Sequence, residues 1–202
     1  MTVLVCVIIC YLLGSVIFSI VIGKLWKGVD IRKHGSGNAG ATNALRVMGK
    51  VPALLIFALD IAKGVLGVWI GTWVAPDDYY VRVICGLAVI IGHNWPVFFR
   101  FKGGKGIATT IGIVATLSFW PGFAAGIIGI LAIILTRYVS LGSLLFTGLF
   151  PITAWVMGAR HEIVLASLAI MVLAFWRHKS NIRKLLSGKE NKLGAKRTVD
   201  HS

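Results

Sequence analysis

The chain has 202 residues, of which 57% are hydrophobic and only 14% are charged, and its mean hydropathy is +0.85. A soluble domain is usually about half apolar, with about a quarter of its residues charged. The apolar residues also form long runs, so the composition excludes an ordinary soluble domain and indicates an integral membrane protein. The net charge of +14 does not indicate nucleic-acid binding, because the basic residues flank apolar runs, where they contact lipid headgroups.

Seven apolar runs predict an all-α polytopic membrane protein with seven transmembrane helices. A spanning helix needs about 20 apolar residues, with a range of about 17 to 25. The first run lacks a basic leader and a small-residue cleavage site, so it is expected to be a retained helix rather than a signal peptide. The runs are Val3–Gly23, Val51–Val74, Val81–Phe99, Ile107–Trp120, Gly122–Thr136, Leu141–Met157 and Glu162–Trp176.

The distribution of charge predicts the orientation of these helices. If the seven helices alternate, the first, third and fifth connections and the C-terminal end lie on one side. They carry 18 of the 21 Lys and Arg residues. The positive-inside rule therefore predicts an N-terminus outside and a C-terminus in the cytosol. We expect residues 1–187 to form a single membrane domain and residues 188–202 to be a polar, basic tail without a catalytic role.

The segment Gly35–Arg46 is the strongest functional signal in the chain. It is small, polar and glycine-rich between two apolar segments, and its glycines let backbone N–H groups approach a ligand closely. A nest of N–H groups followed by the forked cation of Arg46 suits a phosphate. The alternative is a flexible connection in which Gly and Asn only make turns. The candidate residues are Gly35, Ser36, Gly37, Asn38, Gly40, Thr42, Asn43 and Arg46.

A second glycine-rich loop precedes the run that starts at Ile107. Gly103, Gly104 and Lys105 would lie at the N-terminus of that helix, where the helix dipole and the lysine both favour an anion. The alternative for Lys105 is an ordinary anchor in the lipid headgroups. His93, upstream in an apolar context, can equally serve packing or function.

A third polar segment, Arg177–Glu190, follows the last run. Its general pattern is that of a basic amphipathic helix at the membrane interface. His178 and Asn181 are three residues apart, so both can point toward a site on the same side of the membrane as the two loops.

Other polar residues give weaker signals. Asp60 and Lys63 are three apart within an apolar run, where a functional role competes with a structural pair that reaches the headgroups. Ser140 and Ser143 can cap a helix, and Ser143 is retained as a possible ligand contact. The three cysteines lie in apolar runs without metal-ligand spacing, which favours packing; no metal site is expected.

These three segments together resemble the bacterial acyl-phosphate:glycerol-3-phosphate acyltransferases, the PlsY family. The resemblance covers nearly the whole chain, with one departure at Lys184-Leu185, where Arg-Leu is expected. The matching motifs are Gly35-Ser36-Gly37-Asn38 with Thr42-Asn43 and Arg46; Gly92-His93 through Pro96 to Lys102-Gly103-Gly104-Lys105-Gly106; and Arg177-His178 with Asn181-Ile182 and Gly188-Lys189-Glu190.

The resemblance implies transfer of a fatty acyl group from acyl phosphate to the 1-hydroxyl of glycerol 3-phosphate, which yields lysophosphatidic acid and phosphate. It implies a monomer in the bacterial inner membrane, in contact with lipids, with its site on the cytosolic side and without a cofactor. The catalytic residues would be Ser36, Arg46, Lys105, His178 and Asn181. The substrate-binding residues would be Gly35, Gly37, Asn38, Gly40, Thr42, Asn43, His93, Gly103, Gly104 and Ser143.

No general base is evident in the sequence. The chain has no His-x-x-x-x-Asp pair, and neither His93 nor His178 has a carboxylate partner nearby in sequence. Our hypothesis is that a substrate phosphate accepts the proton while the protein supplies positioning and charge. The rival function is a transporter of organic phosphates, although no internal repeat is evident; a scaffold without chemistry would leave the three motifs unexplained.

Overall fold

The computed structural model describes residues 2–194, which form helices joined by turns and loops, with no strand in this range. Residues 195–202 of the predicted tail lie outside the described range. The elements are α1 (Thr2–Ser15), α2 (Phe18–Lys27), η1 (Ile31–Lys33), α3 (Ala41–Met48), α4 (Lys50–Val74), α5 (Tyr79–Asn94), η2 (Val97–Phe99), α6 (Ile107–Leu117), α7 (Phe119–Thr136), α8 (Val139–Val156), α9 (His161–Arg177) and α10 (Lys179–Leu186).

Each of the seven predicted runs contains an apolar helix, but not every helix is long enough to span a membrane alone. Within residues 2–194, five segments are long and apolar enough, and α9 with α10, bent by 65°, is a sixth candidate. Helix α6 has 11 residues. At about 1.5 Å per residue it covers roughly half of a hydrocarbon core about 30 Å thick. The long apolar helices and their exposed apolar side chains confirm the predicted all-helical architecture with several apolar helices; the seven spans and their orientation stay predictions.

The predicted first helix is broken in the structure. Helix α1 ends at Ser15 and α2 begins at Phe18, although the sequence has no proline or charge at this point. The Lys63 ammonium, from α4, accounts for the break, because it donates hydrogen bonds to the carbonyls of Gly14 and Val16. A continuous α-helix would have used such carbonyls within its own backbone.

Glycines allow the helices to pack at close range. A Cβ on Gly14 would overlap the backbone of Val89, and one on Gly92 would overlap the carbonyl of Tyr11, so α1 and α5 are in near-backbone contact. Helices α4 and α6 approach each other in the same way at Gly64. Small residues at helix contacts are typical of membrane bundles, in which van der Waals packing is a main source of association.

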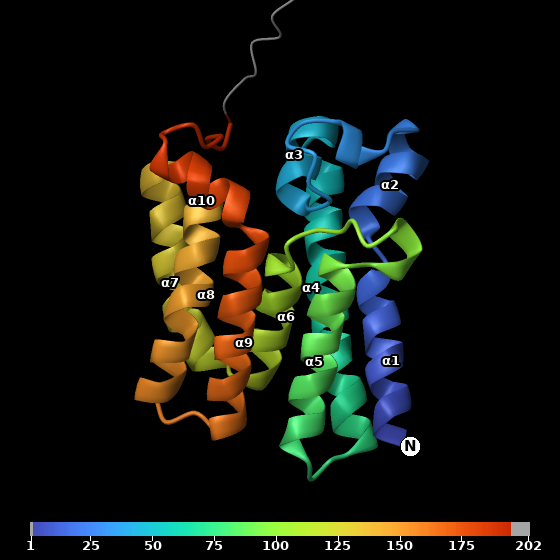
Figure 1. Ribbon diagram of the computed structural model, residues 1–202, viewed down its shortest axis with the longest axis vertical. Helices are drawn as coiled ribbons and strands as arrows, with labels where there is room; N and C mark the ends of the chain where they lie inside the picture. The colour runs from blue at the N-terminus through green and yellow to red at the C-terminus, as the bar shows by residue number, and fades with distance from the viewer. Residues whose placement is uncertain (1, 195–202) are drawn as a thin grey trace, which may run out of the picture.

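The connections that carry the three sequence motifs lie toward one end of the bundle, whereas the α4–α5 and α8–α9 connections lie at the other. Figure 1 shows α2, α3, α10 and the residues after α10 gathered at the upper end, with the loop between α5 and α6 lying deeper along the long axis. The helices therefore bring the three sequence motifs, which are far apart in the chain, to a common region.

The α1–α5 contact gives a stability prediction. Replacing Gly92 by Ala forces backbone apart, and overpacking of this kind usually costs about 1–3 kcal/mol. For a domain of this size that corresponds to a fall in Tm of about 3–10 °C. The control is Gly148→Ala in α8, whose added Cβ would meet the Phe175 ring at an ordinary 3.5 Å. Equal melting temperatures for the two purified variants would contradict the close contact.

Candidate active site

A cavity of about 830 Å³ collects most of the residues that the sequence singled out. It extends from the polar connections down between α6, α7 and α8. Gly35 and Gly104 are not in its wall but lie in the same loops, beside residues that are. The predicted residues that line it are Ser36, Gly37, Asn38, Gly40, Thr42, Asn43, Arg46, His93, Gly103, Lys105, Ser143, His178 and Asn181.

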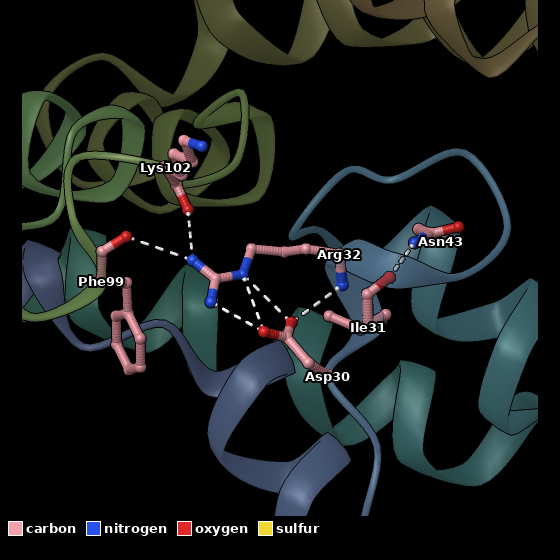
Figure 2. Close-up of polar contacts among 6 residues, drawn as sticks. All are labelled: Asp30, Ile31, Arg32, Asn43, Phe99 and Lys102. Carbon is pink, nitrogen blue, oxygen red and sulfur yellow. Dashed lines mark hydrogen bonds and ion pairs between the residues drawn. The ribbon is translucent and has the colours of Figure 1, made fainter.

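Asn43 determines the shape of the first loop. Its Oδ1 accepts the N–H of Ser36 at 2.8 Å, and its Nδ2 donates to the carbonyls of Ile31 at 3.1 Å and His34 at 3.0 Å. The side chain is 1% exposed, and Figure 2 shows its contact with Ile31. Gly35, at φ +61°, takes a left-handed conformation that favours glycine. Asn43 thus holds the loop that presents Ser36 to the cavity.

Hydrogen bonds from Arg32, which pairs with Asp30, join the segment before the first loop to the second loop. Asp30 contacts the Arg32 guanidinium at 2.7 Å, and Arg32 donates to the carbonyls of Phe99 at 3.1 Å and Lys102 at 3.4 Å (Figure 2). Hydrogen bonds from Arg32 lower the pKa of Asp30 to about 2, so the pair stays charged at neutral pH. Sequence reasoning missed this connection, because nothing in the local pattern indicates a contact 67 residues away.

Gly104 fits into a space that no larger residue could occupy. Its N–H donates to the carbonyl of His93 at 3.0 Å, and an added Cβ would overlap the His93 ring and lie 2.8 Å from the carbonyl of Ala39. The second loop therefore packs on the His93 ring on one side and on the first loop on the other. Close approach of backbones explains the glycine here.

Arg177 fastens the second loop from the opposite side. Its guanidinium donates to the carbonyl of Gly104 at 2.7 and 3.0 Å and to that of Gly103 at 3.2 Å, and it stacks over the ring of Trp95. Arg177 also lines the cavity. The sequence motif contained this residue, but the forked, loop-clamping contact could not be inferred without the fold.

Lys105 begins a chain of polar contacts across the cavity mouth. Its Nζ donates to Asn181 Oδ1 at 2.5 Å, and Asn181 Nδ2 donates to Glu190 Oε1 at 2.8 Å. Ser140 donates to the same carboxylate oxygen at 3.0 Å. Glu190 was expected in a tail without a role, yet it lines the cavity and links α8 to α10. Residues 188–194 are therefore part of the site's surroundings.

The pKa of Lys105 depends on its burial and on the neighbouring charges. Desolvation lowers the pKa of Lys105 to about 8; Glu190 opposes this shift, whereas Arg177, Arg46 and Lys184 add to it by repulsion. Several cations thus share one small volume with a single nearby carboxylate. Such an arrangement is unfavourable when empty and favours an anionic ligand.

The deeper part of the cavity is apolar. Its wall comes from α6, α7 and α8, and α7 contributes Gly126 at a point where an added Cβ would meet no atom within 4 Å. A cavity that is cationic at the mouth and apolar below suits an amphiphile with a charged head. The apolar residues lining this part include Ile111, Val114, Phe123, Ile127, Ile130, Ile133 and Phe146.

The two serines of α8 do not cap the helix. The N-cap residue is Tyr138, and no side chain bonds the free N–H groups. Ser143 instead donates to the carbonyl of Val139 at 2.9 Å within its own helix. The capping interpretation is therefore wrong, because Ser140 points to Glu190 and Ser143 lines the cavity.

The structure also revises the interpretation of the buried charges. Asp60 and Lys63 pair at 3.0 Å but are 2% and 1% exposed, so they do not reach the headgroups. Asp60 also faces His93 Nδ1 at 3.5 Å, a carboxylate partner that sequence spacing did not reveal. His178 Nδ1 lies 2.8 Å from the carbonyl of Ala174, which can only accept, so this nitrogen carries the proton.

Comparisons with known proteins agree with this arrangement. Residues 4–188 match the family model described as glycerol-3-phosphate acyltransferase. The chain is 51% identical to the glycerol-3-phosphate acyltransferase of Shouchella clausii over 191 residues, covering 92% of this chain and 93% of the relative. The Halalkalibacterium halodurans enzyme is also 51% identical, over 93% of both chains.

Two solved structures are similar throughout. They are crystal structures of PlsY, an integral membrane glycerol 3-phosphate acyltransferase, in its glycerol 3-phosphate and lysophosphatidic acid forms. Both are 40% identical to this chain and cover 96% of each chain, with TM-scores of 0.90 and 0.88. With a family match over almost its full length, a shared bundle and an anion-favouring cavity, this chain belongs to the glycerol-3-phosphate acyltransferase family that includes PlsY.

Proposed function

We propose that this chain transfers a fatty acyl group from acyl phosphate to the 1-hydroxyl of glycerol 3-phosphate, giving lysophosphatidic acid and inorganic phosphate. The observation that carries the proposal is the cavity of about 830 Å³, which is cationic at its mouth and apolar below. An acyl phosphate has this polarity, and glycerol 3-phosphate supplies a second anion. The relatives' names and the two ligand forms of PlsY support the acceptor and the product.

In the proposed reaction the hydroxyl oxygen of glycerol 3-phosphate attacks the acyl carbonyl carbon. The bond from this carbon to the phosphate oxygen breaks, and the hydroxyl proton passes to a phosphate oxygen. Arg46 and Lys105 hold phosphate groups, with support from Ser36. Backbone N–H groups of residues 35–40 stabilise the oxyanion charge that develops. Asn38, Thr42, His178 and Asn181 orient the substrates, and the Gly103-Gly104 loop with His93 and Ser143 completes the binding wall.

Substrate phosphate is the proposed base, because it brings an anionic oxygen to the reacting hydroxyl; of the histidine nitrogens, Nε2 of His178 is the competing candidate, since Nδ1 carries the proton. The His93 ring lies against Gly104, and His178 Nδ1 donates to the carbonyl of Ala174. Acyl phosphate is already activated, so the demand on a base is low. Binding and charge stabilisation then supply most of the rate acceleration.

The proposed membrane arrangement keeps seven spans, with the N-terminus outside and the loops facing the cytosol of a bacterial inner membrane. Most basic residues lie in the connections at the loop end, as the positive-inside rule requires. The short helix α6 packs against α4 and α7 in the bundle, so its length need not match the bilayer. We propose one domain over residues 1–187, followed by a polar tail, in a monomer without a cofactor.

The decisive experiment supplies purified protein with palmitoyl phosphate and glycerol 3-phosphate and follows release of phosphate and lysophosphatidic acid. Stoichiometric release of both without coenzyme A or acyl carrier protein is expected. Absence of turnover under these conditions would remove the proposal. Uptake of glycerol 3-phosphate into proteoliposomes without acylation would favour transport instead.

Lys105 predicts an alkaline limit to activity. Its pKa is lowered to about 8, so the ammonium that holds phosphate is present below pH 8 and is lost as the pH rises. The kcat/KM for glycerol 3-phosphate should fall about tenfold per pH unit above this point. In Lys105→Arg the guanidinium stays charged, so this alkaline limb, the fall of kcat/KM above pH 8, should disappear even if the rate is lower. An alkaline limb that persists in Lys105→Arg would exclude Lys105 as its source.

The apolar part of the cavity predicts a chain-length effect. Gly126 lies seven residues, or about 10 Å, from Ile133 along α7. In Gly126→Leu the side chain should block the deeper half of the cavity. Turnover of palmitoyl phosphate should fall at least about tenfold relative to octanoyl phosphate. The matched control is Leu131→Phe, which adds bulk to the exposed side of the same helix and should leave the ratio unchanged. Equal ratios in the two variants would contradict this placement of the chain.

A further inference from the structure

A buried charged cluster lies beneath the two loops, and the proposed reaction gives no role to two of its members, Asp60 and Lys63. Asp60 and Lys63 come from α4 and His93 from α5, and they are 2%, 1% and 3% exposed. Burying charges inside a membrane bundle is unfavourable unless each is paired and hydrogen-bonded. An apolar residue at each position would avoid the cost of burying a charge. The contacts of these three side chains therefore indicate the role of the cluster.

Lys63 is fully satisfied by three partners. Its Nζ donates to the carbonyls of Gly14 at 3.1 Å and Val16 at 3.0 Å, and it pairs with Asp60 Oδ1 at 3.0 Å. An ammonium has three donors, and all three are used. The two carbonyls lie at the break between α1 and α2, where backbone groups need internal partners because lipid offers none. Lys63 therefore fixes the bend that turns α2 toward the first loop.

Asp60 connects this bend to the second loop. Its Oδ1 lies between Lys63 Nζ and His93 Nδ1, the latter at 3.5 Å. The opposite edge of the His93 ring, at Nε2, lies against Gly104, whose N–H donates to the His93 carbonyl. The carboxylate thus lies at ion-pair distance from a ring on which the second loop rests, although within residues 2–194 neither Asp60 Oδ1 nor His93 Nδ1 makes a hydrogen bond.

The loop position matters because Lys105 follows Gly104 directly. Arg177 clamps the loop from the side, and Arg32 holds the carbonyls of Phe99 and Lys102, so the loop has fixed supports on several faces. The His93 ring is the support beneath it. A tilt of this ring would move Gly104 and change the burial of the Lys105 ammonium.

We infer that Asp60 is a positioning residue: together with Lys63 it holds the His93 ring as the floor of the Gly103–Lys105 loop, and so sets the place of the phosphate-binding lysine. This inference rests on the proposed acyltransferase function. Asp60 lines the cavity wall, but in this inference it acts through His93 and takes no part in bond making.

The test is a double-mutant cycle in the purified full-length chain, with kcat and KM measured per folded enzyme. Asp60→Asn keeps the shape but removes the charge, and His93→Gln removes the ring. Each should lower kcat/KM for glycerol 3-phosphate at least about tenfold. Because both changes remove the same support, the double variant should lose no more than about threefold beyond the worse single variant. Losses that multiply, about a hundredfold or more together, would overturn the inference.

A second readout separates positioning from general destabilisation. If the loop shifts in Asp60→Asn, Lys105 becomes less buried, and the alkaline limb of kcat/KM should move upward from about pH 8. A limb that stays at the wild-type position would overturn the inference. Thr72→Val is the control on α4, since its hydroxyl bonds only to the carbonyl of Val68 in the same helix. This variant should keep both the wild-type rate and the wild-type limb.

If Asp60→Asn alone does not fold, the Asp60→Asn/Lys63→Gln variant leaves no unpaired charge and takes its place in the same cycle. Its limb is expected to move upward as well, because His93 again lacks its carboxylate. An unshifted limb with wild-type kcat/KM would overturn the inference here too. Wild-type protein that makes no lysophosphatidic acid would instead refute the acyltransferase proposal itself, so the two failures are distinguishable.

Discussion

The requirement that backbone groups be satisfied without water governs this structure. Lipid offers no hydrogen bonds, so irregular backbone inside a membrane bundle must be paired by the protein itself. Polar side chains donate hydrogen bonds to backbone carbonyls at three of the interruptions. Lys63 does so at the α1–α2 break, Asn43 in the first loop, and Arg177 and Arg32 in the second loop. The loops that line the cavity can therefore keep a fixed non-helical shape between apolar helices.

This requirement also explains why cations are so numerous near the cavity. Arg32 and Arg177 hold carbonyl groups of the second loop, and Arg177 lines the cavity together with Arg46 and Lys105. The supporting arginines still raise the local positive potential, and Arg177 contributes to the lowered pKa of Lys105. The same side chains that stabilise the loops thus make an anion more favourable in the space between them.

Much of the fold and most of the site residues were accessible from the sequence, for identifiable reasons. Long apolar runs indicate helices in contact with lipid, and they can be recognised from the composition of each helix alone. Glycine-rich polar segments such as Gly35–Arg46 differ in composition from the apolar segments on either side, and this difference indicates a functional role. Most of the predicted polar residues therefore line the cavity. The broken first helix was not predicted, because the contact at the break comes from Lys63, 47 residues from Val16.

The missed features share one physical origin: each depends on a contact between distant segments. The spacing of Asp60 and His93 gives no indication of a shared site, and Glu190 belongs to a polar tail whose composition predicts solvent exposure. Helix packing determines both placements. In particular, Gly71 of α4 packs directly on the backbone of α5 at Val81 and Arg82, and this close approach helps a carboxylate on α4 to reach a ring on α5. Packing between small residues therefore affects which polar groups meet beneath the loops, in addition to the loop residues themselves.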